Sequence, residues 1–233
     1  MNFNTTSESG TGSSSMFDYV CSALLLGAVW GFFEVFFKDV LAMGGKPYTA
    51  ALTSGIGVMI MAAGYALFRR AWIAPMIALF SIAARMIVVP VLGCSPMCRA
   101  NAVVALALLG LFSGAAFYAS SKTKKHIFLT GGLSVGTGTL LSGISFYYAG
   151  LACAPCQYLS NFQAIGGLSS FIAMEVVYWI AFTVILFYPG YGAGMWIASA
   201  VESVKKSRPV PYYAGMLCGS FILILLTGLI LAQ

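Results

Sequence analysis

Long apolar stretches recur along the whole chain and decide what it can fold into. Each runs for about 20 residues, the length that an α-helix needs to cross the hydrocarbon layer of a membrane. Backbone amides find no water there, so each span must satisfy its amides within its own helix. Such windows cover residues 17–38, 48–68, 71–93, 101–120, 127–149, 163–188 and 211–232. The sequence therefore predicts an all-α, polytopic transmembrane bundle of about seven spans, with six as the alternative count.

The composition agrees with membrane residence and divides the chain in two. Hydrophobic residues make up 60% of it and charged residues 8%, whereas charged residues are about a quarter of a soluble domain. Residues 1–16 are rich in Ser, Thr and Gly and are predicted to be a disordered polar tail. Residues 17–233 are predicted to form a single transmembrane helical domain that lies in the lipid bilayer. The net charge of +6 does not indicate a nucleic-acid partner, because the basic residues fall mostly in short loops.

Basic residues are distributed unevenly between alternate loops. The connections after the second, fourth and sixth spans contain eight of them: Arg69, Arg70, Lys122, Lys124, Lys125, Lys205, Lys206 and Arg208. The opposite set holds Lys38, Lys46 and Arg99. By the positive-inside rule, the first set and the amino terminus face the cytoplasm. We expect an integral, multi-pass protein of a bacterial or archaeal cytoplasmic membrane.

Two local patterns refine this arrangement. Apolar residues at helical spacing between Trp196 and Val204, followed by Lys205 and Lys206, predict a short interfacial helix, with an extension of the sixth span as the alternative. Glycines at four-residue spacing predict close helix packing within the membrane. They form three pairs: Gly27 and Gly31, Gly110 and Gly114, and Gly132 and Gly136.

Three ionisable residues, Glu34, Arg85 and Glu175, fall well inside predicted spans. A charge at the helix centre costs about 2.5 to 3.5 kcal/mol even on lenient scales, so such residues usually face a partner or a cavity. Glu34 and Arg85 lie at similar depth in the outer half and can pair, either as a structural lock or as a ligand or proton site. Glu175 has no basic partner at its depth and is either a neutral packing group or part of a proton relay. Tyr148 belongs to the external aromatic belt and is a further candidate ligand contact.

Two short cysteine loops join spans on the predicted external side: Cys94-Ser-Pro-Met-Cys98 and Cys153-Ala-Pro-Cys156. Proline between the cysteines stops the helix and keeps the sulfurs close together. In an oxidising compartment, disulfides within or between the loops are expected. Thiol-disulfide chemistry is an alternative, as is a site for Cu(I), zinc or an iron-sulfur cluster. The sequence identifies no definite cofactor.

Motifs of the familiar enzyme classes are missing, which favours a role other than catalysis: there is no P-loop, no dinucleotide fingerprint and no Ser-His-Asp set.

The chain resembles the substrate-binding S components of energy-coupling-factor vitamin importers. The resemblance is carried by the size of the chain, by an expected outward cavity and by the first-helix run Gly27-Ala-Val-Trp-Gly31-Phe-Phe-Glu34. Those components have six helices and an Ala-x-x-x-Ala pattern in the first, where this chain has glycines. The resemblance implies that a small organic micronutrient binds near Glu34, Arg85 and the cysteine loops, and that an ATPase module is a partner.

These observations predict a membrane transport or substrate-capture protein that takes a small molecule from the external face, alone or as a subunit of a larger transporter. Two other classes stay open. One is an extracytoplasmic membrane protein that handles thiols, disulfides or soft metals through its cysteines. The other is a structural accessory subunit of a membrane complex.

Overall fold

The computed structural model describes residues 15–42, 48–88, 100–122, 127–153 and 157–231, and these fold almost entirely into helices, with no strand among them. The elements are α1 (Met16–Ala42), α2 (Thr49–Phe68), α3 (Ile73–Val88), α4 (Ala100–Lys122), α5 (Ile127–Cys153), α6 (Gln157–Ala164), α7 (Leu168–Phe171), η4 (Ile172–Val176), α8 (Val177–Ser207) and α9 (Pro209–Leu231). The all-α prediction is confirmed.

The helices reproduce the predicted spans closely. Within the described ranges, five helical segments are long and apolar enough to cross a membrane: Met16–Phe37, Thr49–Phe68, Ala100–Lys122, Leu168–Ser207 and Pro209–Ile230. A shorter apolar helix covers Ile73–Ile87, and α5, with 27 residues, covers the predicted span 127–149 and continues to Cys153. The chain is therefore an integral, multi-pass helical membrane protein. Most of the predicted polar tail, residues 1–14, lies outside the described part of the chain.

The segment after Tyr188 does not form a separate interfacial helix. It continues α8, so that α7, η4 and α8 make one helical segment of 40 residues, Leu168–Ser207. Pro189 lies inside this helix, and the carbonyl that it leaves without a partner is tolerated in membrane helices when neighbours compensate. Two glycines that follow it pack directly on α2, as described below, and favour continuation of the helix. The sequence had allowed this extension as the alternative.

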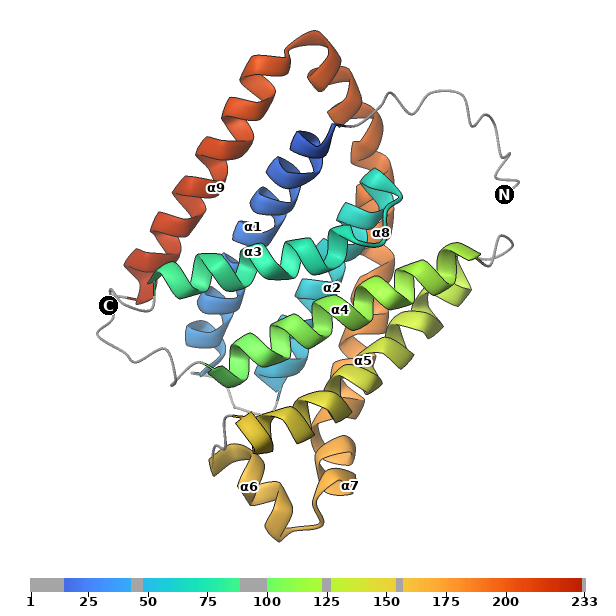
Figure 1. The fold of residues 1–233 in the computed structure, drawn as a ribbon, viewed down its shortest axis with the longest axis vertical. Helices are drawn as coiled ribbons and strands as arrows, with labels where there is room; N and C mark the ends of the chain where they lie inside the picture. Colours follow the sequence, from blue (N-terminus) through green and yellow to red (C-terminus); the bar gives the residue numbers. More distant parts are fainter. Residues whose placement is uncertain (1–14, 43–47, 89–99, 123–126, 154–156, 232–233) are drawn as a thin grey trace.

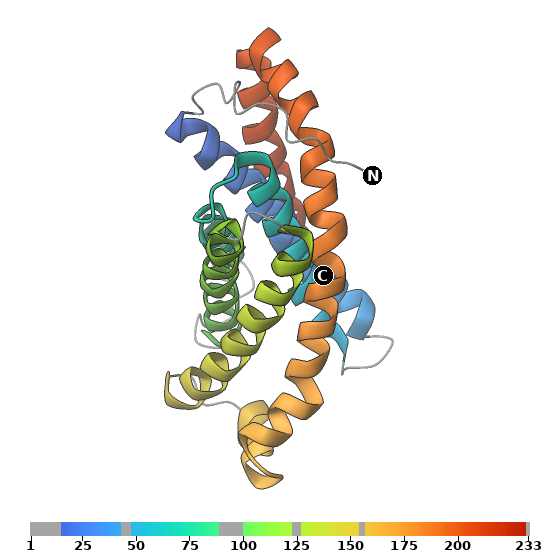
Figure 2. The same ribbon diagram turned by 90° about the vertical axis from the view of Figure 1, so that its right-hand side faces the viewer.

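The long helix α8 runs along one side of the molecule and α2 packs against it (Figures 1 and 2). In Figure 1, α9 descends beside α1 in the upper part, and α3 and α4 cross in front of α2. The contacts between elements agree, since α1 packs on α3 and α9, and α4 packs on α3 and α5. The main core lies between α1, α2, α3, α4 and α8, and includes the buried side chains of Trp30, Met61, Ile77, Phe117 and Phe187. A second, aromatic core around Phe171 fills the end formed by α5, α6, α7 and η4.

Glycines bring the backbones of α2 and α8 into close contact. A Cβ built on Gly190 would lie 2.2 Å from the carbonyl oxygen of Met59, and one on Gly194 would lie 2.4 Å from that of Ala63. No side chain fits between the helices at these positions. Gly27 plays the same role for α1 on α3, because its Cβ would lie 2.8 Å from the carbonyl oxygen of Ile77. The packing role expected for Gly27 is therefore present.

A polar contact ties three helices together where α1 begins. Lys205 Nζ near the end of α8 donates to Asp18 Oδ2 across 2.5 Å, and the Tyr213 hydroxyl of α9 donates to Asp18 Oδ1. The Asp18 side chain is 3% exposed. Its carboxylate therefore holds the start of α1 between the end of α8 and the start of α9.

Candidate functional site

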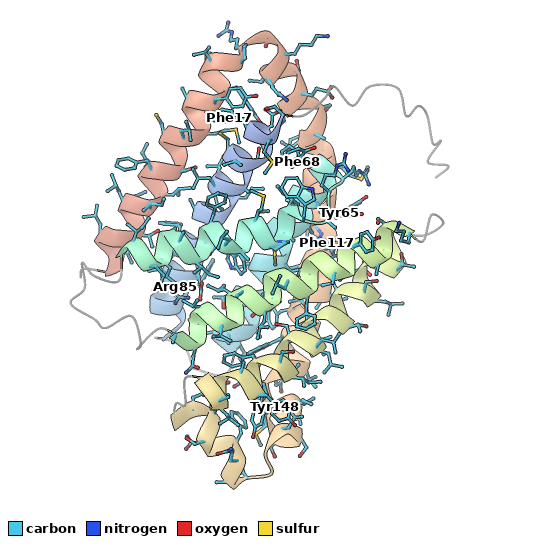
Figure 3. All side chains as sticks on the ribbon, viewed as in Figure 1. Phe17, Tyr65, Phe68, Arg85, Phe117 and Tyr148 are labelled. Carbon is cyan, nitrogen blue, oxygen red and sulfur yellow. The ribbon has the colours of Figure 1, made fainter. Side chains whose placement is uncertain are left out.

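Glu34 on α1 and Arg85 on α3 form an ion pair inside the bundle. Arg85 Nη1 donates to Glu34 Oε1 across 2.5 Å, and the two side chains are 1% and 10% exposed respectively. Both charges have left water, which costs several kcal/mol per ion unless attraction and further hydrogen bonds compensate. This confirms the pairing of Glu34 with Arg85 that was predicted from their similar depth in the membrane. Arg85 lies near the end of α3, as Figure 3 shows.

Most of the polar atoms around this pair have no partner. Within the described part of the chain, Arg85 Nε and Nη2, Glu34 Oε2, Ser81 Oγ and Trp30 Nε1 are buried and make no hydrogen bond. A buried polar group without a partner costs about 1–3 kcal/mol, and more when it is charged. Folded proteins satisfy nearly all such groups with protein or water. Partners for these atoms must therefore come from water or from a bound molecule.

Helix spacing relates the residues that carry these atoms. Ser81 precedes Arg85 by one turn of α3, and Trp30 precedes Glu34 by one turn of α1, so each pair shares a helix face. Close packing fixes the Trp30 ring against α2, because a Cβ on Gly57 would lie 2.4 Å from its atoms Cε2 and Cζ2. We define the polar centre as Trp30, Glu34, Ser81 and Arg85. It is contributed by α1 and α3 and backed by α2.

The chemistry of the polar centre is donor-rich and close to neutral in charge. Glu34 compensates the charge of Arg85, so the pair carries no net charge when both groups are ionised. The unpaired atoms offer four donor groups on Arg85, Ser81 and Trp30, together with one carboxylate acceptor on Glu34. Such a set is chemically complementary to oxygen or nitrogen acceptors beside at least one donor.

Glu175 lies apart from the polar centre, in the π-helical turn η4. It is half-buried, and its polar neighbours include the Tyr158 hydroxyl of α6 and the Trp179 indole of α8. Trp179 Nε1 is buried and makes no hydrogen bond of good geometry. Single π-helical turns within α-helices occur frequently at functional sites. The structure thus places Glu175 in an aromatic setting without a basic partner among these neighbours, and its proposed relay role stays a prediction.

Tyr148 is not part of either group. Its side chain is 59% exposed, and its ring packs edge-on against Tyr147 at a centroid distance of 5.6 Å. Figure 3 places it far from Arg85, in the lower part of the molecule beside α6 and α7. Its roles in the aromatic belt and in ligand binding stay predictions.

The cysteine loops cannot be placed against this site. Cys94, Cys98 and Cys156 lie outside the described residues, and Cys153 is the last residue of α5, with a side chain that is also outside the description. Their disulfide, redox or metal role stays a prediction. Among the described cysteines, Cys21 is buried and Cys218 is exposed, and both are free.

Sequence reasoning missed Ser81 and Trp30 as members of the polar centre. A signal for each was available, because each lies four residues before one of the buried charges. Serine and tryptophan are common in membrane helices, so the spacing alone did not distinguish them from packing residues.

Comparisons with models of known families, with curated proteins and with solved structures found no match to this chain.

Proposed function

We propose that this protein captures a small molecule at the external side of the membrane, as a transport protein or as the substrate-binding subunit of one. The observation that carries the proposal is the polar centre. A structural ion pair would be expected to have its remaining hydrogen-bonding capacity satisfied, whereas here five buried atoms on four residues are left without partners.

The unpaired atoms indicate the chemistry of the ligand. Glu34 neutralises Arg85, so a ligand with a large net charge would be left buried without a counterion. The donors on Arg85, Ser81 and Trp30 favour carboxylate, carbonyl or ring-nitrogen acceptors, and Glu34 Oε2 favours a donor. A neutral or zwitterionic organic molecule with both kinds of group meets these requirements.

The resemblance to S components of vitamin importers points to the same class of ligand and to a partner ATPase module. In this chain, however, Gly27 and Gly31 of α1 lie against α3, at Ile77, Phe80 and Ser81. The small-residue face of α1 is therefore used within the protein. A partner subunit would have to contact a different surface.

Gentle purification tests the proposal. The protein is extracted in mild detergent, washed, and its small-molecule content is released and identified by mass spectrometry. We expect one neutral or zwitterionic compound in near-stoichiometric amount, and at least a tenfold loss of it in a Glu34→Gln, Arg85→Gln double variant. The double change removes both charges while keeping two polar side chains, so no single charge is left buried.

A matched control removes a buried polar pair elsewhere. Thr139 and Thr183 share a hydrogen bond of 3.0 Å between α5 and α8, so a Thr139→Val, Thr183→Val variant should retain the compound. The proposal fails if the wild-type protein carries nothing above the level of an unrelated membrane protein. It also fails if the double variant at the polar centre, still folded and monodisperse, retains the compound to the same extent.

A further inference from the structure

A second polar site lies at the other end of α3, where the chain turns from α2. It is a groove of about 520 Å³ between this turn and the second half of α4. Its walls include Tyr65, Arg69, Arg70, Trp72, Leu111 and Tyr118. Figure 3 shows Tyr65 near one end of α3 and Arg85 near the other. We refer to this second site as the basic groove.

The basic groove carries positive charge without compensation. Among the described residues that line it, two are Arg and none is Asp or Glu. The ion pairs formed by described residues involve Arg85 and Lys205, not Arg69 or Arg70. Arg69 Nη1 donates to the neutral Tyr191 hydroxyl, and its guanidinium lies 5.5 Å from the centroid of the Tyr191 ring. Arg69 and Arg70 therefore bring two positive charges to the lining of the groove, and no ion pair among the described residues uses either of them.

The backbone at Arg69 supports a specific role for this side chain. Arg69 follows the last residue of α2 and adopts a left-handed conformation with φ of 53°. Glycine is the usual residue there, because a side chain costs about 1 kcal/mol in this conformation. Among the described non-glycine residues, Arg69 alone has a positive φ. Strained residues of this kind concentrate at ligand sites, since the surrounding contacts must hold them in place.

The rest of the basic groove is apolar and opens to the side of the bundle. Leu111 and Tyr118 of α4 lie two turns apart on one face and are each 58% exposed. In a protein that spans a membrane, an exposed apolar stripe of this kind faces lipid. Gly114 between them lets α4 approach the turn, because its Cβ would lie 2.9 Å from Pro75 Cδ. Trp72, 37% exposed at the rim, is a residue type typical of the membrane interface.

We propose that the basic groove binds the headgroup of an anionic phospholipid. The phosphate group would accept hydrogen bonds from Arg69 and Arg70, and the acyl chains would lie along the exposed stripe of Leu111 and Tyr118. Lys122, whose Nζ lies 5.1 Å from the Tyr118 ring centroid, adds a third positive charge near the rim. Basic pockets between transmembrane helices recognise such headgroups through the same combination. A soluble phosphate would use the arginines but not the apolar wall, so the lateral opening favours the lipid.

This inference is independent of the proposed function, because the basic groove shares no residue with the polar centre. Native mass spectrometry of the full chain in a neutral detergent measures binding of added dioleoyl phosphatidylglycerol and of dioleoyl phosphatidylcholine as a reference. We expect the anionic lipid to bind at a concentration at least tenfold lower than the zwitterionic one. Each basic residue at a membrane surface changes lipid affinity by about fivefold, so Arg70→Gln should weaken phosphatidylglycerol binding by about that factor.

Lys206→Gln provides the matched control, since it removes one exposed charge from the end of α8, outside the groove. It should change affinity by less than twofold. Arg69→Gln is a second variant in the groove. If loss of the Tyr191 contact prevents it from folding, Arg70→Gln still tests the proposal. Equal binding of the two lipids would overturn the proposal, as would equal effects of Arg70→Gln and Lys206→Gln. Displacement of the lipid by millimolar inorganic phosphate would assign the site to a soluble anion instead.

Discussion

Replacing Gly190 with alanine should force α8 away from α2. The new methyl group would lie 2.2 Å from the carbonyl oxygen of Met59 and 2.8 Å from its Cα. Both atoms belong to the backbone of a buried helix and cannot rotate aside. Ordinary contact begins near 3.4 Å, so the helices would have to separate by about 1 Å. Because α2 and α8 pack more extensively than any other pair of described helices, the separation would loosen the central contact of the bundle.

A second substitution on the same helix separates the energetic cost of the clash from the gain in helix propensity. Gly192 has no atom within 4 Å of its would-be Cβ, so Gly192→Ala adds the same methyl group without a clash. Both changes gain about 1 kcal/mol of helix propensity. Overpacking costs about 1–3 kcal/mol, and a clash with backbone belongs at the upper end of that range. We therefore expect Gly190→Ala to be less stable than Gly192→Ala by about 3 kcal/mol, roughly a hundredfold in the ratio of folded to unfolded protein.

Reversible unfolding in mixed micelles, with increasing mole fraction of sodium dodecyl sulfate and detection by circular dichroism, measures the two free energies. Gly192→Ala should equal or exceed the wild type, and Gly190→Ala should fall below it. The reasoning would be refuted by two variants of equal stability, because the α2–α8 contact would then not be as close as the structure has it. Thermal unfolding of the same proteins gives a second measurement, in which the order of melting temperatures should be the same.

Three further predictions use the same unfolding assay. Arg85→Met leaves the Glu34 carboxylate buried without its partner and should lower the free energy of unfolding by about 3–5 kcal/mol. Adding Glu34→Gln should restore most of this loss, and no recovery would mean that the two side chains do not interact. Asp18→Asn weakens the contacts to a lysine and a tyrosine that hold α1, α8 and α9 together, and should cost about 2 kcal/mol, whereas a change below 0.5 kcal/mol would contradict a tie between these helices. A double-mutant cycle of Thr139→Val and Thr183→Val should give a coupling of about 0.6 kcal/mol for their buried hydrogen bond, and strict additivity would argue against that bond.

The spans could be predicted because the membrane imposes a local requirement. A helix of about 20 apolar residues satisfies its own amides, so window length and composition are sufficient to find it. The Glu34–Arg85 pair could be predicted for a similar reason, since alternation of helix direction sets the depth of each residue. Whether Ser81 and Trp30 belong to the polar centre depends on how α1 and α3 rotate about their axes. That rotation is a property of tertiary packing and leaves no mark in hydropathy.

The course of α8 could not be read from local pattern alone. Apolar residues at helical spacing between Trp196 and Val204, followed by two lysines, favour a separate surface helix, and Pro189 lacks an amide hydrogen and ordinarily breaks or kinks a helix. In the structure, Gly190 and Gly194 fit against the backbone of α2 immediately after the proline. This tertiary contact outweighs the local preference. Gly190 and Gly194 also have the four-residue spacing of a membrane packing motif.

Both proposed sites depend on α3, and its packing explains how they are kept apart. Pro75, in its first turn, forms part of the basic groove, whereas Arg85, in its last turn, belongs to the polar centre. Glycines hold the helix from two sides, since a Cβ on Gly27 of α1 would lie 2.7 Å from Phe80 Cβ and one on Gly110 of α4 would lie 2.3 Å from Ala78 Cβ. With so little free space, α3 cannot slide along either neighbour without a clash. Glu34 therefore stays paired with Arg85, and the two arginines of the basic groove stay beyond the opposite end of α3.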